Sequence, residues 1–332
     1  MSTPALTLDP WIGTTLKGTY QIVGKIADGG MGAVYEAKHL RLGQRVALKL
    51  LLPESALRPE LVARFRREAE VVANLGHPHI VSLLDVDQTD AGQPFLVLEY
   101  LEGETLAARL SRQPEFDLPS VASIALQIAS GLACTHEQGI VHRDPKPENV
   151  FLVRATGERD FVKILDYGVS KVIGAHITCD QAVLGTPAYM APEQVRSPAS
   201  VDHRIDQYAL AAIVYEMFSG KVPHAGRSVS EILDSILGKD PLPLSELASW
   251  VPAEIERVVM RALHHDPNRR YPSISEFSTA LAGALTHDRV SGVRKREDAN
   301  TDGARGLAMW ARARAAFVSE RLDDAMGHGQ EL

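Results

Sequence analysis

The stretch that decides the fold is His142-Arg143-Asp144-Pro145-Lys146-Pro147-Glu148-Asn149. Seventeen residues after Asn149 comes Asp166-Tyr167-Gly168, directly behind the apolar run 161–165. A third stretch follows at 185–193, with the sequence Gly-Thr-Pro-Ala-Tyr-Met-Ala-Pro-Glu. Any one of these stretches can arise by chance, but chance does not readily give three of them in this order and at this spacing.

A glycine cluster lies upstream, in the stretch Ala27-Asp28-Gly29-Gly30-Met31-Gly32-Ala33-Val34. Glycines let a turn bring backbone N–H groups close to phosphate oxygens, because no Cβ stands in the way. An ordinary hairpin turn carries similar glycines, so the cluster alone does not distinguish the two. The residues that follow favour a phosphate-binding loop.

A lysine and a glutamate follow this loop at positions where they can pair. Lys49 ends the apolar segment Val46-Ala47-Leu48-Lys49, and a lysine is almost never fully buried unless it is paired. Glu68 lies three residues after Phe65 and four before Val72, so it shares their face of a helix. The spacing predicts an ion pair between Lys49 and Glu68; the alternative is a solvated Glu68 beside the apolar stripe.

The wider pattern predicts a β-rich first part and a helical second part. Strands rich in Val, Ile, Tyr and Leu are expected at 20–26, 33–39, 45–51, 80–85 and 94–100, with one helix at 59–75. After Gly103, helices are expected at 120–137, 206–219, 253–264 and 274–285. Between them, 166–198 has few periodic signals, and a long loop inside a domain is usually functional.

Taken in order from Ile26 to about Arg270, these motifs resemble the eukaryotic-like Ser/Thr protein kinases of the bacterial type. The resemblance implies a bilobal α+β fold with ATP bound between the lobes. The kinase domain is expected at 16–286, with a small, mainly β N-lobe at 16–100 and a larger, mainly α C-lobe at 104–286. Residues 1–15 would be an N-terminal extension, and 287–332 a linker and an amphipathic tail.

The resemblance also implies catalytic roles, because phosphoryl transfer needs positioning and charge neutralisation more than covalent help. Asp144 would orient the substrate hydroxyl and accept its proton, while Lys146 would offset charge on the γ-phosphate. Asn149 and Asp166 would bind Mg²⁺, a hard cation that suits amide and carboxylate oxygens.

ATP itself would be held by the N-lobe and by the connection between the lobes. Lys49, fixed by Glu68, would bind the α- and β-phosphates. The gatekeeper position falls on Leu98. The residues expected around ATP are Ile26, Val34 and Ala47 as the roof over adenine, Ala27, Asp28, Gly29, Gly30, Met31, Gly32 and Ala33 as the loop, Leu98 as the gatekeeper, and Glu99 and Leu101 as the hinge.

Three further residues match positions that support the fold in this family. Asp206 corresponds to the helix residue that braces the catalytic loop from below. Glu193 and Arg270 correspond to a buried ion pair that holds the end of the activation segment. Removing one member of such a pair costs about 3–5 kcal/mol of stability.

The chain departs from the family pattern at three positions. Ala27 replaces the first glycine of the loop, and since alanine resists positive φ, a modest loss of ATP affinity is expected. Tyr167 replaces phenylalanine, and its hydroxyl needs a partner if it is buried. Pro145 replaces leucine, lacks an N–H and biases Asp144 towards extended backbone.

These departures keep an alternative open, a pseudokinase that binds nucleotide and acts as a signalling scaffold without phosphoryl transfer. Every charged group that the reaction needs is nevertheless present. Lys146 and Thr186 resemble the Ser/Thr class rather than the Tyr class. A small-molecule kinase is disfavoured, because 185–193 resembles a peptide-docking platform.

Regulation by phosphorylation is expected from Arg143, which in this family marks kinases that are switched on through the activation segment. An arginine binds a phosphate with two charge-assisted hydrogen bonds. Thr178 is the predicted target, whereas the Thr186 hydroxyl is reserved for bracing Asp144 and Lys146. The alternative is a kinase that is active without modification.

Composition limits the remaining possibilities. The chain has 332 residues, a net charge of −7 and two distant cysteines, Cys134 and Cys179, so neither a nucleic-acid binder nor a disulfide framework is expected. The longest apolar run noted, 209–217, is too short to span a membrane. A cytoplasmic enzyme with protein substrates is expected, and the oligomeric state stays open. The tail 305–326 is expected to dock on the body, to be loosely ordered or to bind a partner.

Overall fold

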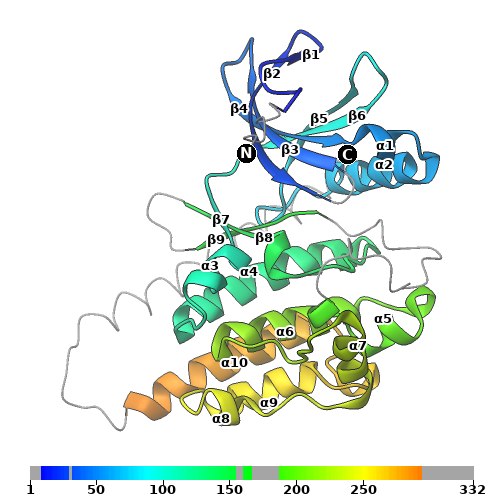
Figure 1. Ribbon diagram of the computed structural model, residues 1–332. Coiled ribbons are helices and arrows are strands. Elements are labelled where there is room, and N and C mark those ends of the chain that lie inside the picture. The colour runs from blue at the N-terminus through cyan, green and yellow to red at the C-terminus, as the bar shows by residue number, and fades with distance from the viewer. Residues whose placement is uncertain (1–8, 30–31, 155–159, 167–186, 294–332) are drawn as a thin grey trace, which may run out of the picture. The chain divides into compact units, whose positions relative to one another are not determined.

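A six-stranded antiparallel sheet forms the N-terminal lobe (Figure 1). The computed structural model describes residues 9–29, 32–154, 160–166 and 187–293, with side chains up to Leu285 apart from that of Ala199. The strand order is β1-β2-β3-β4-β6-β5. The strands are β1 (Thr15–Leu16), β2 (Tyr20–Asp28), β3 (Gly32–His39), β4 (Arg45–Leu51), β5 (Leu83–Gln88) and β6 (Pro94–Glu99).

The alternation of side chains along β3 and β4 divides this sheet into two faces. Every second residue packs into one buried cluster, which contains Tyr35, Leu48 and Phe95. Successive residues of a strand point to opposite faces. Val34, Ala47 and Lys49 therefore point away from this cluster. The predicted ATP-facing residues of β3 and β4 thus share one face of the sheet.

Helix α2 (Pro59–Ala73) packs against this sheet after a short helix, α1 (Pro53–Ala56). Proline at the first position suits a helix start, since that N–H has no partner inside the helix. Phe65 and Ala69 form a buried cluster with strand residues Leu51 and Leu96. Glu68 is only 5% exposed, so its predicted inward position is confirmed and the solvated alternative is wrong.

A second, three-stranded sheet follows the N-lobe and was not predicted. Its strands, in spatial order, are β7 (Gly103–Thr105), β8 (Val150–Val153) and β9 (Phe161–Ile164). Strands of three or four residues carry too little periodicity to stand out in a sequence. The expected strand 80–85 also shifts: β5 begins only at Leu83, and Ile80 forms an isolated bridge to Ile164.

Helices build the C-terminal lobe around α6, whose residues are buried on nearly every side. A helix that is apolar all round belongs at the centre of a domain. The helices are α3 (Leu106–Arg112), α4 (Leu118–Glu137), α5 (Pro192–Arg196), α6 (Arg204–Ser219), α7 (Val229–Gly238), α8 (Leu244–Leu247), α9 (Ala253–Ala262) and α10 (Ile274–Val293). Single 3-10 turns cover Pro147–Asn149, Pro187–Tyr189, Pro198–Ser200 and Pro267–Arg269.

Helix α4 is the one helix among the described residues that is long and apolar enough to cross a membrane. Val121, Ile124 and Leu132 of α4 are fully buried and belong to the same core cluster as α6. The length and apolarity of α4 are accounted for by its place in this core.

Several helices differ from the sequence-based expectation: none of α1, α3, α5, α7 and α8 was predicted, and α10 runs past its expected end. Helix α7 begins after Ser228, whose side chain accepts a hydrogen bond from the Glu231 N–H and so caps the first turn. Helix α10 continues to Val293, into the expected linker, because no proline interrupts 286–293 and an existing helix extends readily. The chain divides into two units after Leu285, and the expected tail 305–326 lies outside the described residues.

Candidate active site

Lys49 stands between two carboxylates at the junction of the lobes. Its Nζ lies 2.7 Å from Glu68 Oε1 and 2.7 Å from Asp166 Oδ1. The Glu68 side chain is 7% exposed, whereas that of Asp166, which follows β9, is 52% exposed. The predicted Lys49–Glu68 pair is therefore present, and its outer partner Asp166 is open to solvent.

Electrostatic interactions within this trio favour the charged forms of Lys49 and Asp166. Burial alone would lower the pKa of Lys49, but the charges of Asp166 and Glu68 outweigh it and raise that pKa above its ordinary value. Burial raises the pKa of Glu68 despite the attraction of Lys49. The Asp166 side chain is half exposed, and the hydration that it loses to the surrounding protein is outweighed by the charge and hydrogen bond of Lys49, so its pKa falls below its ordinary value. Asp166 thus remains an anionic oxygen ligand at neutral pH.

The catalytic loop begins with a residue in an unusual conformation, because Arg143 has a φ of 70°. The buried Asp206 carboxylate accepts hydrogen bonds from the backbone N–H groups of His142 and Arg143, both at 2.8 Å. On the other side, Gln194 Nε2 donates to the Arg143 carbonyl at 3.0 Å. Both peptide groups of Arg143 are therefore held, and Asp206 braces the loop as the resemblance implied.

Asp144, Lys146 and Asn149 come together in this loop as predicted. Lys146 Nζ lies 3.0 Å from Asp144 Oδ2. Asn149 Nδ2 donates to the Asp144 backbone carbonyl at 2.9 Å and to its Oδ2 at 3.3 Å. Pro145 is buried between them, and no described peptide bond is cis. The proline therefore does not separate Asp144 from its two partners.

Asn149 and Asp166 offer a donor set that fits a divalent cation. Since the amide nitrogen of Asn149 donates to two Asp144 oxygens, its carbonyl oxygen is the atom left for a metal. The Asn149 backbone carbonyl also accepts from the Leu165 N–H at 2.8 Å, which places Asn149 next to the residue preceding Asp166. An amide oxygen and a carboxylate are ligands that Mg²⁺ accepts.

Packing of β3 against β4 explains why a glycine stands at position 32, at the end of the loop between β2 and β3. A Cβ on Gly32 would collide with the backbone carbonyl oxygen of Leu50 on β4. Across the loop, the Gly29 N–H donates to the Gly32 carbonyl at 2.8 Å. Gly30 and Met31 lie outside the described residues. Gly32 is thus required by the close approach of β3 and β4, whatever the loop binds.

The backbone of Ala27 and the side-chain direction of Ala33 differ from what the sequence suggested. Ala27 belongs to β2, pairs with Val34 and has no positive φ, so the expected strain of an alanine at this position is wrong. Ala33 is 1% exposed and packs into the core of the N-lobe sheet. Its side chain therefore points away from the ATP side, and only its backbone remains available there.

The register of the sheet brings together the remaining residues that were expected around adenine. Ala47 pairs with Leu98, and Val34 pairs with Lys49. Ile26, near the end of β2, is 51% exposed. The side chain of Glu99 has a contact that was not predicted: its Oε1 accepts from Lys163 Nζ at 2.6 Å and from the Ser82 N–H at 2.7 Å.

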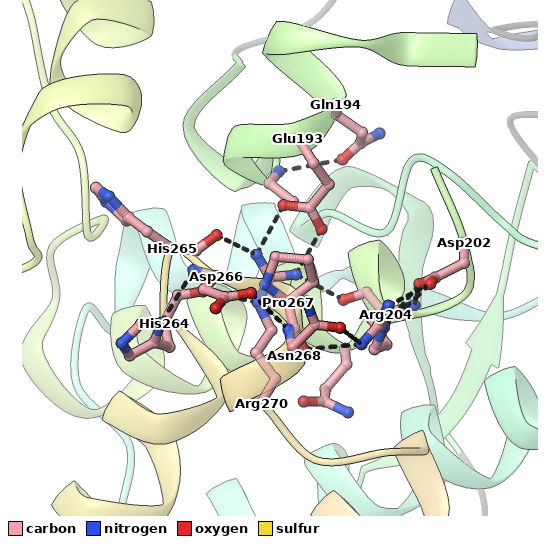
Figure 2. Close-up of polar contacts among 12 residues, drawn as sticks. Glu193, Gln194, Asp202, Arg204, His264, His265, Asp266, Pro267, Asn268 and Arg270 are labelled. Carbon is pink, nitrogen blue, oxygen red and sulfur yellow. Dashed lines mark hydrogen bonds and ion pairs between the residues drawn. The ribbon is translucent and has the colours of Figure 1, made fainter. Parts of the chain in front are cut away.

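The predicted ion pair between Glu193 and Arg270 is present and bidentate (Figure 2). Arg270 Nη1 and Nη2 lie 2.6 and 2.8 Å from the two Glu193 oxygens. Nε donates to the His264 carbonyl at 2.7 Å, and Nη1 also donates to the Arg204 carbonyl at 3.1 Å. A guanidinium only 2% exposed therefore has partners around its planar fork, as burial of a charge requires.

Several contributors to the site carried no signal in the sequence, among them His136, Lys163 and Gln194. His136 Nε2 lies 2.8 Å from Asp206 Oδ2, and Lys163 reaches Glu99 from β9. Each acts on a residue distant in the chain, so no local period marks it. Tyr167, Gly168, Thr178, Thr186 and the segment 169–184 lie outside the described residues.

The two lobes, the Lys49–Glu68 pair and the Asp144–Lys146–Asn149 loop define the class of phosphoryl-transferring enzymes with a protein kinase fold. Residues 20–280 match the family described as "Protein kinase domain". The chain belongs to this family, in agreement with the resemblance to bacterial Ser/Thr kinases.

Relatives with known names support the bacterial type. The chain is 40% identical over 311 residues to serine/threonine-protein kinase Pkn1 of Myxococcus xanthus, covering 93% of this chain and 43% of Pkn1. It is 35% identical over 272 residues to PknB of Mycobacterium tuberculosis, covering 80% of this chain and 43% of PknB. The chain therefore spans less than half the length of these two relatives.

Solved structures agree with the fold. The kinase domain of Mycobacterium tuberculosis PknI matches 82% of this chain and 98% of its own chain, with 31% sequence identity and a TM-score of 0.65. The bilobal α+β architecture expected from the sequence is confirmed.

Proposed function

We propose that this chain transfers the γ-phosphoryl group of ATP to Ser and Thr hydroxyls of proteins. The observation that carries the proposal is the position of Lys49, whose Nζ lies 2.7 Å from the carboxylates of both Glu68 and Asp166. A lysine held in this way presents a fixed positive charge to nucleotide phosphates, and phosphoryl transfer depends on such positioning. Lys49 would bind the α- and β-phosphates.

Asp144 is the proposed base for the protein hydroxyl. It accepts the hydroxyl proton while the hydroxyl oxygen forms a bond to the γ-phosphorus and the bond to the β-γ bridging oxygen breaks, leaving ADP. Lys146, 3.0 Å from Asp144 Oδ2, lies where it can offset charge on the transferred group. The proposed roles rest on this geometry together with the family membership.

The proposed metal is Mg²⁺, with Asn149 Oδ1 and the Asp166 carboxylate as protein ligands. The hydrogen bonds of Asn149 Nδ2 to Asp144 support this assignment, because they turn the amide oxygen away from that carboxylate. Held there by Asn149 and Asp166, the cation would supply positive charge against the charge of the phosphates. Asp166 is suited to it by its ionised state.

The proposal that the substrate is a protein is supported by Tyr189 and Met190, which follow the expected activation segment. A hollow beside Asp144 and Lys146 is also lined by Tyr189 and Met190. The Tyr189 hydroxyl donates to Glu216 on α6 at 2.6 Å, which ties this segment to the core of the C-lobe.

A cytoplasmic location is also proposed. The free thiol of Cys134 suits a reducing compartment, and the proposed reaction needs a compartment that contains ATP.

Activation by phosphorylation of Thr178, with Arg143 as the phosphate-binding residue, is part of the proposal. Mass spectrometry after incubation with Mg-ATP should find phosphate on Thr178, and Thr178→Ala should lower activity. Full activity of that variant, with no phosphate found between 169 and 184, would show that Arg143 has a structural role only.

Transfer of labelled γ-phosphate to the chain itself or to a generic basic protein tests the central proposal. The wild type should incorporate label, and Asp144→Asn should not. ADP binding, measured by calorimetry on both proteins, separates the outcomes. Binding without any transfer in the wild type would instead support a nucleotide-binding scaffold.

A further inference from the structure

Arg45, the first residue of β4, reaches three different side chains at the edge of the N-lobe. Its Nε donates to Glu36 Oε1 at 2.9 Å, and its Nη1 donates to Glu102 Oε1 at 2.6 Å. The guanidinium carbon lies 3.8 Å from the centre of the Tyr100 ring. One side chain thus connects β3 with two residues of the hinge, the segment 99–102 that follows β6.

These contacts bracket the residue expected to meet adenine. Leu101 stands between Tyr100 and Glu102, and both of these neighbours touch Arg45. On β4, Arg45 is followed by Val46 and Ala47, which pair with Glu99 and Leu98. Arg45 therefore continues the contact between β4 and β6 beyond the last paired strand residues.

Residues of the C-lobe also contact this segment. The Arg154 N–H donates to the Glu102 carbonyl at 2.7 Å. Lys163 of β9 contacts the Glu99 side chain at 2.6 Å and also donates to the Ile80 carbonyl at 3.2 Å. Beyond the backbone pairing of Val46 with Glu99, Arg45 adds a side-chain connection from Tyr100 and Glu102 of the hinge to the strands β3 and β4, which carry the adenine roof.

We propose that Arg45 is a positioning residue for nucleotide binding: it sets the Leu101 backbone at a fixed distance from the roof formed by Val34 and Ala47. This inference rests on the proposed function, because it assumes that adenine binds between the roof and the hinge.

The chemistry of the side chain explains why arginine stands here. A planar guanidinium can lie flat on an aromatic ring and at the same time donate in its plane to two carboxylates. A lysine ammonium has one point of charge and cannot make the three contacts together. The Arg45 side chain is 47% exposed, so its ion pairs add little to the stability of the fold. Its effect should therefore appear in the position of the hinge backbone.

The test is ADP affinity, measured by calorimetry on the whole chain, together with the KM for ATP and kcat. Arg45→Ala should raise the Kd of ADP and the KM for ATP by about three- to tenfold, the size expected when one hydrogen bond is weakened. The value of kcat should stay within about twofold, because Asp144 and Lys146 belong to the C-lobe. Arg45→Lys should recover only part of the affinity.

Tyr100 and Arg58 supply the controls. Tyr100→Ala removes the ring on which Arg45 lies and should weaken ADP binding without adding to the effect of Arg45→Ala. Arg58 makes an exposed pair with Glu60 in the same lobe, and Arg58→Ala should leave ADP affinity unchanged.

The outcomes separate the inference from the function on which it rests. Unchanged ADP affinity in Arg45→Ala, or an equal loss in Arg58→Ala, would overturn the role of Arg45 while leaving the kinase proposal intact. A wild-type chain that does not bind ADP would overturn the nucleotide site itself and this inference with it.

Discussion

The Asp206 carboxylate accepts a hydrogen bond at 2.8 Å from the backbone N–H of Arg143, a residue with a φ of 70°. A left-handed backbone at a residue other than glycine costs about 1–2 kcal/mol. The turn that presents Asp144 is therefore imposed by a side chain on α6, more than sixty residues later in the chain. Gln194 holds the Arg143 carbonyl from the opposite side.

Replacing Asp206 should damage both stability and catalysis. In Asp206→Asn, one carboxylate oxygen becomes an NH₂ group that faces N–H donors, and both loop contacts cannot be kept. The free energy of unfolding should fall by about 2–4 kcal/mol, measured by urea denaturation, and kcat should fall at least tenfold. Asp202→Asn, which alters an exposed pair with Arg204, is the control and should change the free energy of unfolding by less than about 1 kcal/mol.

Variants of Asp144 and Lys49 should distinguish the loss of phosphoryl transfer from the loss of nucleotide binding. Asp144→Asn should abolish phosphoryl transfer while ADP affinity stays within about threefold, because Asp144 addresses the hydroxyl and not the nucleotide. Lys49→Ala should lose both, since it removes the charge held between Glu68 and Asp166. Calorimetry and a transfer assay measure the two effects. Equal transfer by Asp144→Asn and the wild type would contradict the assignment of Asp144.

Pro145→Leu should leave kcat unchanged or raise it. The substitution restores an N–H and frees Asp144 from the restriction before proline, while the contacts of Asp144 with Lys146 and Asn149 do not depend on the ring. Steady-state kinetics measure the effect. A tenfold fall, equivalent to about 1.4 kcal/mol in the barrier, would show that this loop is built around its proline.

The burial of His224 predicts that the free energy of unfolding falls in acid. It is 1% exposed, and Nε2 and Nδ1 lie 3.0 and 3.2 Å from the Tyr208 and Ser235 hydroxyl oxygens. Burial, aided by nearby His265 and opposed by Asp240, lowers its pKa from 6.5 to about 4. Between these values the unfolded chain binds more protons than the folded one, so stability falls as the pH drops from 6.5 towards 4.

The size of this effect should be on the order of 2–3 kcal/mol between pH 7 and pH 4. Urea denaturation at a series of pH values measures it, and His224→Gln, which cannot take up the proton, should flatten that part of the pH profile. A profile that keeps the same slope in His224→Gln would assign the acid sensitivity to other groups.

Local periodicity was sufficient to predict several features of the site. Helical spacing placed Glu68 on the same face as Phe65 and Val72, and the structure pairs it with Lys49. The strands 20–26, 33–39, 45–51 and 94–100 were found close to the predicted positions. These predictions succeeded because burial of one face imposes a period of about 3.6 residues on a helix and of 2 on a strand.

Apart from Asp206, which the family resemblance identified, the residues that hold the catalytic loop and the hinge in place were revealed only by the tertiary structure. His136, Gln194, Lys163 and Arg45 act through contacts with residues distant in the chain, and such contacts leave no period in the sequence around them. The facing of Ala33 into the core was likewise set by the register of β3 with its neighbours. The chemical groups needed for phosphoryl transfer are written in local motifs, whereas their mutual positions depend on side chains that meet only when the chain is folded.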